Sequence, residues 1–434
     1  MVKILALSLA MLAASAGASA APAADPAELR STISALVSFG TRHSLSSASD
    51  PKRGIGAARK WAAARFRQYA KACGGCLKVE MVSERFTGPR APDGVDIVNV
   101  LAIQPGTTDP DHVVMVSAHI DSRVTDVMNA TADAPGANDD GSGSALVIEA
   151  ARLLSREHHG ATIVYALLSG EEQGLFGGQL LAKTAKARGW KVAALLNNDI
   201  VGNTHGIGGQ HIEDRVRVFS EGIRSSETLE EAKMRRGIGG EDDGPSRALA
   251  KYVDRIATIA KPSLEVLAIR RPDRFQRGGD HSPSLDMGYP AVRITEATEN
   301  YDRQHQDLRT ENGKAYGDTI DGVDFPYLAR VTDLNVAAMR ALAAAPAAPD
   351  NATISGALSN DTTVRWPAVP GATAYRVYWR RADGSDWTDH KDVNGTEILL
   401  KDVNIDDNFF GVAAVSAGGA ESIVTFCAGQ PRRN

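Results

Sequence analysis

Apolar residues follow two alternating patterns along the chain from about residue 97 onward. Three runs of β-branched and aliphatic residues have the continuity of strands that are buried on both faces: residues 113–117, 163–168 and 192–200. Between these runs, apolar residues recur at helical spacing over residues 146–154 and 180–187. This β-α-β-α-β order predicts an α/β fold, with a mostly parallel, mixed sheet sandwiched by helices.

The elements outside this centre are less regular. The pattern predicts a helix over residues 246–260, a strand over 290–295 and a closing amphipathic helix over 328–342. Residues 206–277 are charged and yield few other elements. We expect residues 24–95 to supply helices and a cap over the sheet, with its aromatic residues buried rather than catalytic: Trp61, Phe66 and Tyr69.

The composition changes after the small-residue, proline-containing stretch AAAPAAPD. Five short strands then follow, separated by Gly, Pro, Asn and Asp: residues 362–366, 374–379, 396–400, 409–415 and 422–426. We therefore predict a main domain over residues 21–345, a linker over 346–350 and a small all-β sandwich over 351–434. The run TVRWPAVPGATAYRVYWR resembles a fibronectin type III domain.

The N-terminus has the pattern of a secretory signal. Lys3 precedes an apolar run over residues 4–14, and small residues follow up to Ala20. We predict a signal peptide over residues 1–20 and a secreted or periplasmic protein, because the apolar run is too short to span a bilayer.

Cysteine use fits an oxidising compartment. Cys73 and Cys76 form a CGGC pair, and Cys427 lies near the C-terminus. A local disulfide in CGGC is the expected state, and a redox dithiol or a zinc ribbon is the alternative.

Charge excludes several classes of partner. The 434 residues carry a formal net charge of −5, without a long block of like charge. Neither a nucleic-acid footprint nor an integral membrane segment is indicated after the signal. The C-terminal module could bind a surface or a polymer.

Metal-binding side chains follow the ends of the predicted strands. His119 and Asp121, in SAHIDS, are at i, i+2 spacing, so both side chains lie on one face. Asp121 can then accept the second ring N–H of His119, which leaves the other ring nitrogen facing a metal. More carboxylates follow in a Gly-rich turn and after later strands: Asp139, Asp140, Glu171, Glu172 and Asp199. Because parallel strands end at one sheet edge, these carboxylates would repel one another without cations.

Together these segments resemble the co-catalytic zinc exopeptidases, a family that includes bacterial leucyl aminopeptidases, glutamate carboxypeptidases and, as relatives, glutaminyl cyclases. The resemblance is dense over residues 112–205 and 278–308. It implies the zinc exopeptidase fold and two zinc ions per chain, with Asp139 bridging ions that lie about 3.5 to 4 Å apart. It also implies a cis peptide bond between Asp139 and Asp140. The implied ligands are His119, Asp139, Glu172, Asp199 and His305.

Two histidines compete for the last ligand position. His281 lies in GGDHSPS and His305 lies in ENYDRQHQD. In the family that the chain resembles, the segment corresponding to DHSP lines the substrate pocket, and the histidine after the acidic stretch is the ligand. The resemblance therefore implies that His305 binds metal, and that Asp280 and His281 line the pocket or support the ligands from behind.

The resemblance also implies a mechanism. A water held between the metals becomes the nucleophile, and Glu171 acts as general base and then as acid to the leaving amine. We predict Glu171 and Asp121 as the catalytic carboxylates, the latter by orienting His119. The expected activity is that of an exported aminopeptidase, which removes N-terminal residues from peptides.

Two departures from the family pattern leave the substrate open. The expected last ligand lies in QHQD, where the family more usually has His-Thr, and four arginines precede Asp280: Arg270, Arg271, Arg274 and Arg277. These arginines form either a solvated loop or a contact for an acidic group or a substrate carboxylate. Three aromatic residues fit either a specificity pocket or the core: Phe176, Trp190 and Tyr301.

The alternatives to an aminopeptidase are a carboxypeptidase or a glutaminyl-cyclase-like enzyme on the same scaffold, and an inactive binding protein. A cyclase uses one metal, whereas residues for two are present here. An inactive protein would not be expected to keep the full ligand set and Glu171.

Overall fold

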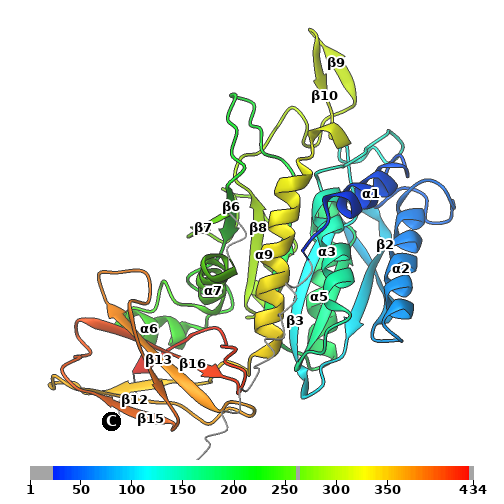
Figure 1. Cartoon of the computed structure of the whole chain (residues 1–434). Coiled ribbons are helices and arrows are strands. Elements are labelled where there is room, and N and C mark those ends of the chain that lie inside the picture. Colours follow the sequence, from blue (N-terminus) through cyan, green and yellow to red (C-terminus); the bar gives the residue numbers. More distant parts are fainter. Residues whose placement is uncertain (1–22, 261–263, 430–434) are drawn as a thin grey trace, which may run out of the picture.

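An eight-stranded sheet forms the centre of the protein (Figure 1). The computed structural model describes residues 23–260 and 264–429, so the predicted signal peptide lies outside the described residues. The strand order is β1-β2-β4-β3-β5-β8-β6-β7. The bounds are Lys78–Gly88 (β1), Ala91–Gln104 (β2), Asp109–His119 (β3), Ala161–Leu168 (β4), Lys191–Asn198 (β5), Arg215–Phe219 (β6), Glu265–Ile269 (β7) and Ala291–Glu296 (β8). The four central strands β4, β3, β5 and β8 are parallel, which confirms the predicted fold class.

The central strands are those that the apolar runs predict. Every residue of β4 and β8 is buried, because helices cover both faces of the sheet. Alternation assigns successive side chains of β3 to the two faces. Val114 and Val116 pack in the larger core, whereas Val113 and Met115 pack in the smaller one.

Helices cover the sheet unequally. The larger core packs against α1 (Pro26–Val37), α2 (Ile55–Ala72), α3 (Gly141–Leu154), α7 (Pro245–Ala260) and α9 (Phe325–Ala344). On the other face lie α5 (Phe176–Ala187) and the short α8 (Ser282–Asp286). The remaining helices are the one-turn α4 (Glu171–Gly174) and the exposed α6 (Leu229–Ile238).

The region before residue 97 differs in part from the prediction. Residues 26–72 supply the helices α1 and α2, and Phe66 is fully buried while Trp61 and Tyr69 are partly buried against the core. However, residues 78–104 form the antiparallel strands β1 and β2 instead of a cap. β1 is an edge strand with mostly exposed or half-buried residues, so it lacks the continuous apolar run that marks a central strand.

The chain after the linker forms two four-stranded sheets, in the orders β15-β12-β11-β18 and β14-β13-β16-β17. Their bounds are Thr353–Ser355 (β11), Thr362–Arg365 (β12), Ala374–Arg381 (β13), Asp389–Val393 (β14), Glu397–Leu400 (β15), Asn408–Val415 (β16), Thr425–Phe426 (β17) and Ala428–Gly429 (β18). Trp366, Tyr375 and Phe410 belong to the core of this unit. The aromatic residues of the TVRWPAVPGATAYRVYWR run therefore serve packing.

The C-terminal unit is docked beside α6 and α7 (Figure 1). Arg380 of β13 makes a buried ion pair with Asp243, at 2.5 Å between Nη2 and Oδ2. Arg255 of α7 contacts Glu421 at 2.8 Å. A small hairpin of β9 (Arg309–Glu311) and β10 (Lys314–Tyr316) projects at the opposite end of α9 (Figure 1).

Cys73 and Cys76 form the expected local disulfide, and Cys427 is a buried free thiol. Among the described residues, no helix is both long enough and apolar enough to cross a membrane.

Candidate metal centre

The predicted site residues meet where the parallel strands end. β3 ends at His119, β5 is followed at once by Asp199, and Glu171 and Glu172 lie in α4 just after β4. The loop after β8 carries His305. Since β4, β3, β5 and β8 are neighbours in the sheet, these segments converge at its carboxyl edge.

The Asp139 carboxylate lies between two groups of possible metal ligands. Its Oδ1 is 3.1 Å from Nε2 of His119, and its Oδ2 is 2.8 Å from Nε2 of His305. Asp199 joins the first group, at 3.8 Å from His119 Nε2, and Glu172 joins the second, at 2.9 Å from His305 Nε2. Ligand atoms within each group lie within 4.8 Å of one another. Each oxygen of one carboxylate thus faces a separate cluster.

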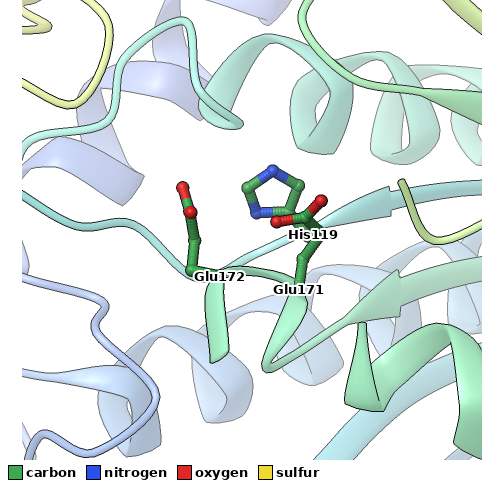
Figure 2. A group of neighbouring side chains, drawn as sticks. All are labelled: His119, Glu171 and Glu172. Atoms are coloured by element: carbon green, nitrogen blue, oxygen red, sulfur yellow. The ribbon is translucent and has the colours of Figure 1, made fainter. Parts of the chain in front are cut away.

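Glu171 forms a third such group with His119 and Glu172. Figure 2 shows the side chains of Glu171 and Glu172 rising from the same turn, with Glu171 close to His119 and Glu172 to one side of its ring. Burial raises the pKa of Glu171 well above its usual range.

His119 is oriented by Asp121. The Nδ1 atom of His119 lies 3.1 Å from the main-chain oxygen of Asp121 and 3.5 Å from its carboxylate. Both neighbours are acceptors, which favours the tautomer with a proton on Nδ1 and a free lone pair on Nε2. The predicted role of Asp121 is therefore shared between its carboxylate and its carbonyl group.

Arg123 contacts two of the predicted ligands, although no sequence pattern indicated a role for it. Its Nε donates to Glu172 Oε2 at 2.7 Å, and its Nη2 lies 2.5 Å from Nδ1 of His305. Burial alone would lower the pKa of His305, but Glu172 and Asp139 outweigh this effect and raise it to about 10. The charge excess of the carboxylates thus favours a cation at this point.

The turn that carries Asp139 is fixed from several sides. Asp318 accepts hydrogen bonds from the main-chain N–H groups of Asn138 and Asp139, the latter at 2.7 Å. Asp140 caps α3 by accepting from Gly143 N, and its other oxygen accepts from His119 N. The peptide bond between Asp139 and Asp140 is cis, as the family resemblance implies.

Two buried arginines brace the same edge of the sheet. Arg42 donates to the carbonyl oxygens of Ile120, Pro135 and Gly136. Arg293 contacts Asp199 Oδ1 at 2.9 Å and donates to the main-chain oxygen of the same residue. No local motif marks either arginine, because each acts through residues that are distant in sequence.

A cavity of about 620 Å³ opens over the cluster. Its lining includes His119, Asp139, Glu171, Glu172, Asp199 and His305, together with Tyr301 and four arginines. Three lining residues other than glycine have positive φ angles, namely Leu175 (57°), Gln276 (54°) and His305 (58°). Such backbone strain tends to gather at functional sites.

Asp280 and His281 are not among the residues that line this cavity. Asp280 accepts from Gly178 N, and Nε2 of His281 lies 2.8 Å from the main-chain oxygen of Pro272. Both side chains are fully buried behind the wall. Phe176 stacks on Phe86 in a satellite core and Trp190 packs at the second core, so Tyr301 is the aromatic residue of the three that lines the cavity.

Comparison with known proteins agrees with this geometry. The sequence profile of peptidase family M28 matches residues 99–324, just over half of the chain. A probable zinc metalloprotease of Leptosphaeria maculans is 45% identical over 401 residues, which cover 91% of this chain and 92% of that protein. The chain belongs to peptidase family M28.

Solved structures share the fold of this M28 peptidase. The LapA aminopeptidase of Legionella pneumophila superimposes with a TM-score of 0.52 at 18% identity, covering 74% of this chain and 70% of that one. A glutaminyl cyclase of Fimbriiglobus ruber also has a TM-score of 0.52, at 19% identity, covering 73% and 95%. The fold by itself does not distinguish the two reactions.

Gly136 tests how tightly the Asp139 turn is packed. It has φ of +51°, and an added Cβ would lie 2.5 Å from Ser122 Cβ and 2.6 Å from the main-chain oxygen of Asp139. Gly136→Ala should lower the free energy of unfolding by roughly 3 kcal/mol or more, since overpacking adds to the cost of a positive φ. Chemical denaturation would measure the loss.

Gly189→Ala is the matched control, because Gly189 also has a positive φ (+67°) but no atom within 4 Å of an added Cβ. It should cost about 1 kcal/mol. Equal losses in both variants would show that the turn has room to adjust.

Proposed function

We propose that this M28 peptidase is an exported aminopeptidase that binds two zinc ions per chain and removes N-terminal residues from peptides. The proposal rests on the position of the Asp139 carboxylate between two ligand groups. Its Oδ1 lies 3.1 Å from His119 Nε2, and its Oδ2 lies 2.8 Å from His305 Nε2. A carboxylate placed in this way can bridge the two ions of a two-metal site.

The donor atoms fit zinc. Imidazole nitrogens and carboxylate oxygens are ligands that zinc accepts in catalytic sites, and a tetrahedral ion leaves a position open for water. His119, Asp139 and Asp199 would hold one ion, and Asp139, Glu172 and His305 the other. Two divalent cations would also neutralise carboxylates that are buried side by side. Relatives such as the L. maculans protein are probable zinc metalloproteases, which supports the same metal.

When bound, a zinc pair acts as a Lewis acid and lowers the pKa of coordinated water. The chain's own contribution is positioning and proton transfer. Glu171 lines the cavity beside His119 and Glu172, and among the described residues no side chain donates a hydrogen bond to its carboxylate. Glu171 is therefore free to accept a proton from water and return it to the leaving amine. Asp121 holds His119 in position.

Two of the alternatives, the cyclase and the inactive binding protein, are less well supported. A cyclase of the kind considered above uses one metal, whereas Asp139 faces two complete ligand groups. An inactive binding protein has no need of Glu171 or of a cavity above the cluster. We further propose that residues 1–20 direct export and that residues 351–434 are a fibronectin type III-like module that could contact a surface or polymer.

An anilide pair tests the reaction. The zinc-loaded enzyme should release chromophore from an aminoacyl anilide with a free amine, but not from the same compound acylated at its amine. Exhaustive chelation should abolish release, and zinc should restore it. Cleavage of the acylated compound alone would favour an endopeptidase. Cleavage of neither compound would favour a carboxypeptidase, a cyclase or a binding protein.

Glu171→Gln should lower kcat by roughly 10² to 10⁴-fold and leave zinc content unchanged, because the change removes proton transfer and no ligand. Steady-state kinetics and elemental analysis would measure the two effects. Glu172→Gln is the contrast, since it should lose zinc as well as activity. A Glu171→Gln enzyme with normal turnover would exclude this residue as the base.

His305→Ala should reduce bound zinc from two ions toward one per chain, because it removes a ligand of the second group. His281→Ala is the control and should keep both ions, since His281 contacts Pro272 behind the cavity wall. Elemental analysis of both purified variants gives the stoichiometry. Loss of zinc from the His281 variant alone would overturn the ligand assignment.

A further inference from the structure

Four arginines lie in the wall of the cavity, beside the carboxylates of the proposed metal centre. Arg90, Arg123, Arg274 and Arg277 line it, whereas Leu175 and Tyr301 are its large apolar residues. A pocket that selects leucine or phenylalanine would be lined mainly by apolar side chains. This wall has instead the composition of a site for a negatively charged group.

Three guanidinium groups share a single carboxylate near this wall. Glu299 accepts from Arg217 at 2.8 Å, from Arg274 at 3.2 Å and from Arg277 at 3.4 Å. One negative charge cannot neutralise three positive charges, so the cluster retains positive charge for a further anion. Asp273 reduces this excess but does not remove it, because it also contacts the buried Arg293, which pairs with Asp199. The linked groups are then four arginines against three carboxylates.

Arg277 is the member that is free to bind a substrate. Its side chain is 38% exposed, and its long contact to Glu299 is its one ion pair within the described part of the chain. Arg274 is only 10% exposed and is held by two carboxylates. Arg123 is occupied by Glu172 and His305, and Arg90 donates to the main-chain oxygen of Glu172. The exposed guanidinium of Arg277 can therefore form a paired contact with a carboxylate.

The loop that presents these arginines is anchored from below. Arg293 Nη1 contacts Asp273 Oδ2 at 3.2 Å and the main-chain oxygen of Gly278 at 3.3 Å. His281 reaches the main-chain oxygen of Pro272. Residues at both ends of the loop are thus fixed to the buried layer behind the cavity. Anchoring reduces the conformational entropy that binding would otherwise cost.

We propose that Arg277, supported by Arg274, binds a substrate carboxylate next to the scissile bond, so that the enzyme prefers substrates that carry a carboxylate at this position. This inference rests on the proposed peptidase function. The same carboxylate chemistry has two sources, namely the side chain of an N-terminal glutamate or aspartate and the free carboxyl terminus of a very short peptide.

Two pairs of substrates separate these sources. Glutamyl anilide and glutaminyl anilide differ only in the charge of the side chain, and neither has a free carboxyl terminus. Leu-Leu and its C-terminal amide differ only in the charge of the terminus. The wild-type enzyme should favour the charged member of one pair by about tenfold or more in kcat/KM, since charge-assisted hydrogen bonds are the strong ones.

Arg277→Gln should bring that ratio toward one, and Arg277→Lys should restore it in part, because lysine keeps the charge but not the paired geometry. Arg271→Gln is the matched control. Arg271 lies in the same arginine-rich segment and is exposed, but it stacks on Phe275 and does not line the cavity. The control should retain both the ratio and the rates of wild type.

Binding separates failure of this inference from failure of the proposed function. Calorimetry on the wild-type and Arg277→Gln proteins, each also carrying Glu171→Gln, would compare glutamyl and glutaminyl anilides without turnover. If the glutamyl compound binds more tightly than the glutaminyl compound, and Arg277→Gln removes the difference, recognition of the substrate side chain is supported. This conclusion would hold even if the wild-type enzyme cleaved neither anilide, because the absence of cleavage would overturn only the peptidase proposal. Carboxylate recognition would be overturned if the wild-type enzyme had equal kcat/KM for the charged and neutral members of both pairs. It would also be overturned if Arg277→Gln left the ratio of these kcat/KM values unchanged.

Discussion

Negative charge that is buried at one edge of the sheet is the constraint on which this structure depends. Asp139, Glu172 and Asp199 are buried beside His119, and Asp139 lies between two histidines. Such a cluster is tolerable only when positive charge compensates it, whether as metal ions, as protonated imidazole or as guanidinium. The residues around the cluster follow from this requirement.

Guanidinium groups supply part of that compensation and also connect the site to its surroundings. Arg293 is fully buried and contacts Asp199 on one side and Asp273 on the other. A single side chain therefore fixes both a proposed zinc ligand and the start of the loop that carries Arg274 and Arg277. The proposed metal centre and the proposed carboxylate-binding arginines thus share one buried support, so a change at Arg293 should disturb both.

The parallel centre of the sheet explains why these groups meet at all. β4, β3, β5 and β8 end side by side. His119 is the last residue of β3, Glu171 and Asp199 follow β4 and β5 closely, and His305 lies further along in the loop after β8. The same architecture places α7 where it covers the sheet with one face and meets Glu421 of the C-terminal unit through Arg255. The C-terminal unit thus lies away from the β9–β10 hairpin that follows the His305 loop (Figure 1).

Local information in the sequence was enough to predict the central strands, the main helices and the candidate ligands. Buried strands have continuous apolar sequences, and the ligand motifs follow these sequences at short spacing. The same reasoning missed β1, β6 and β7. β1 and β7 are edge strands with exposed residues, and β6 is a strand of five residues between β8 and β7, so none of the three has a long continuous apolar run. The family resemblance favoured His305 over His281, whereas spacing alone left both open.

The sequence by itself determined which chemical groups the protein has and which predicted strand each of them follows. Periodicity and motif spacing are properties of neighbouring residues, so both can be read without the tertiary structure. Tertiary structure alone decided which distant groups meet. Arg123 reaches His305 across 182 positions, Asp318 reaches Asp139 across 179, and Arg293 reaches Asp199 across 94. These contacts depend on how strands are ordered in the sheet and how loops cross its edge, and no local pattern encodes that arrangement.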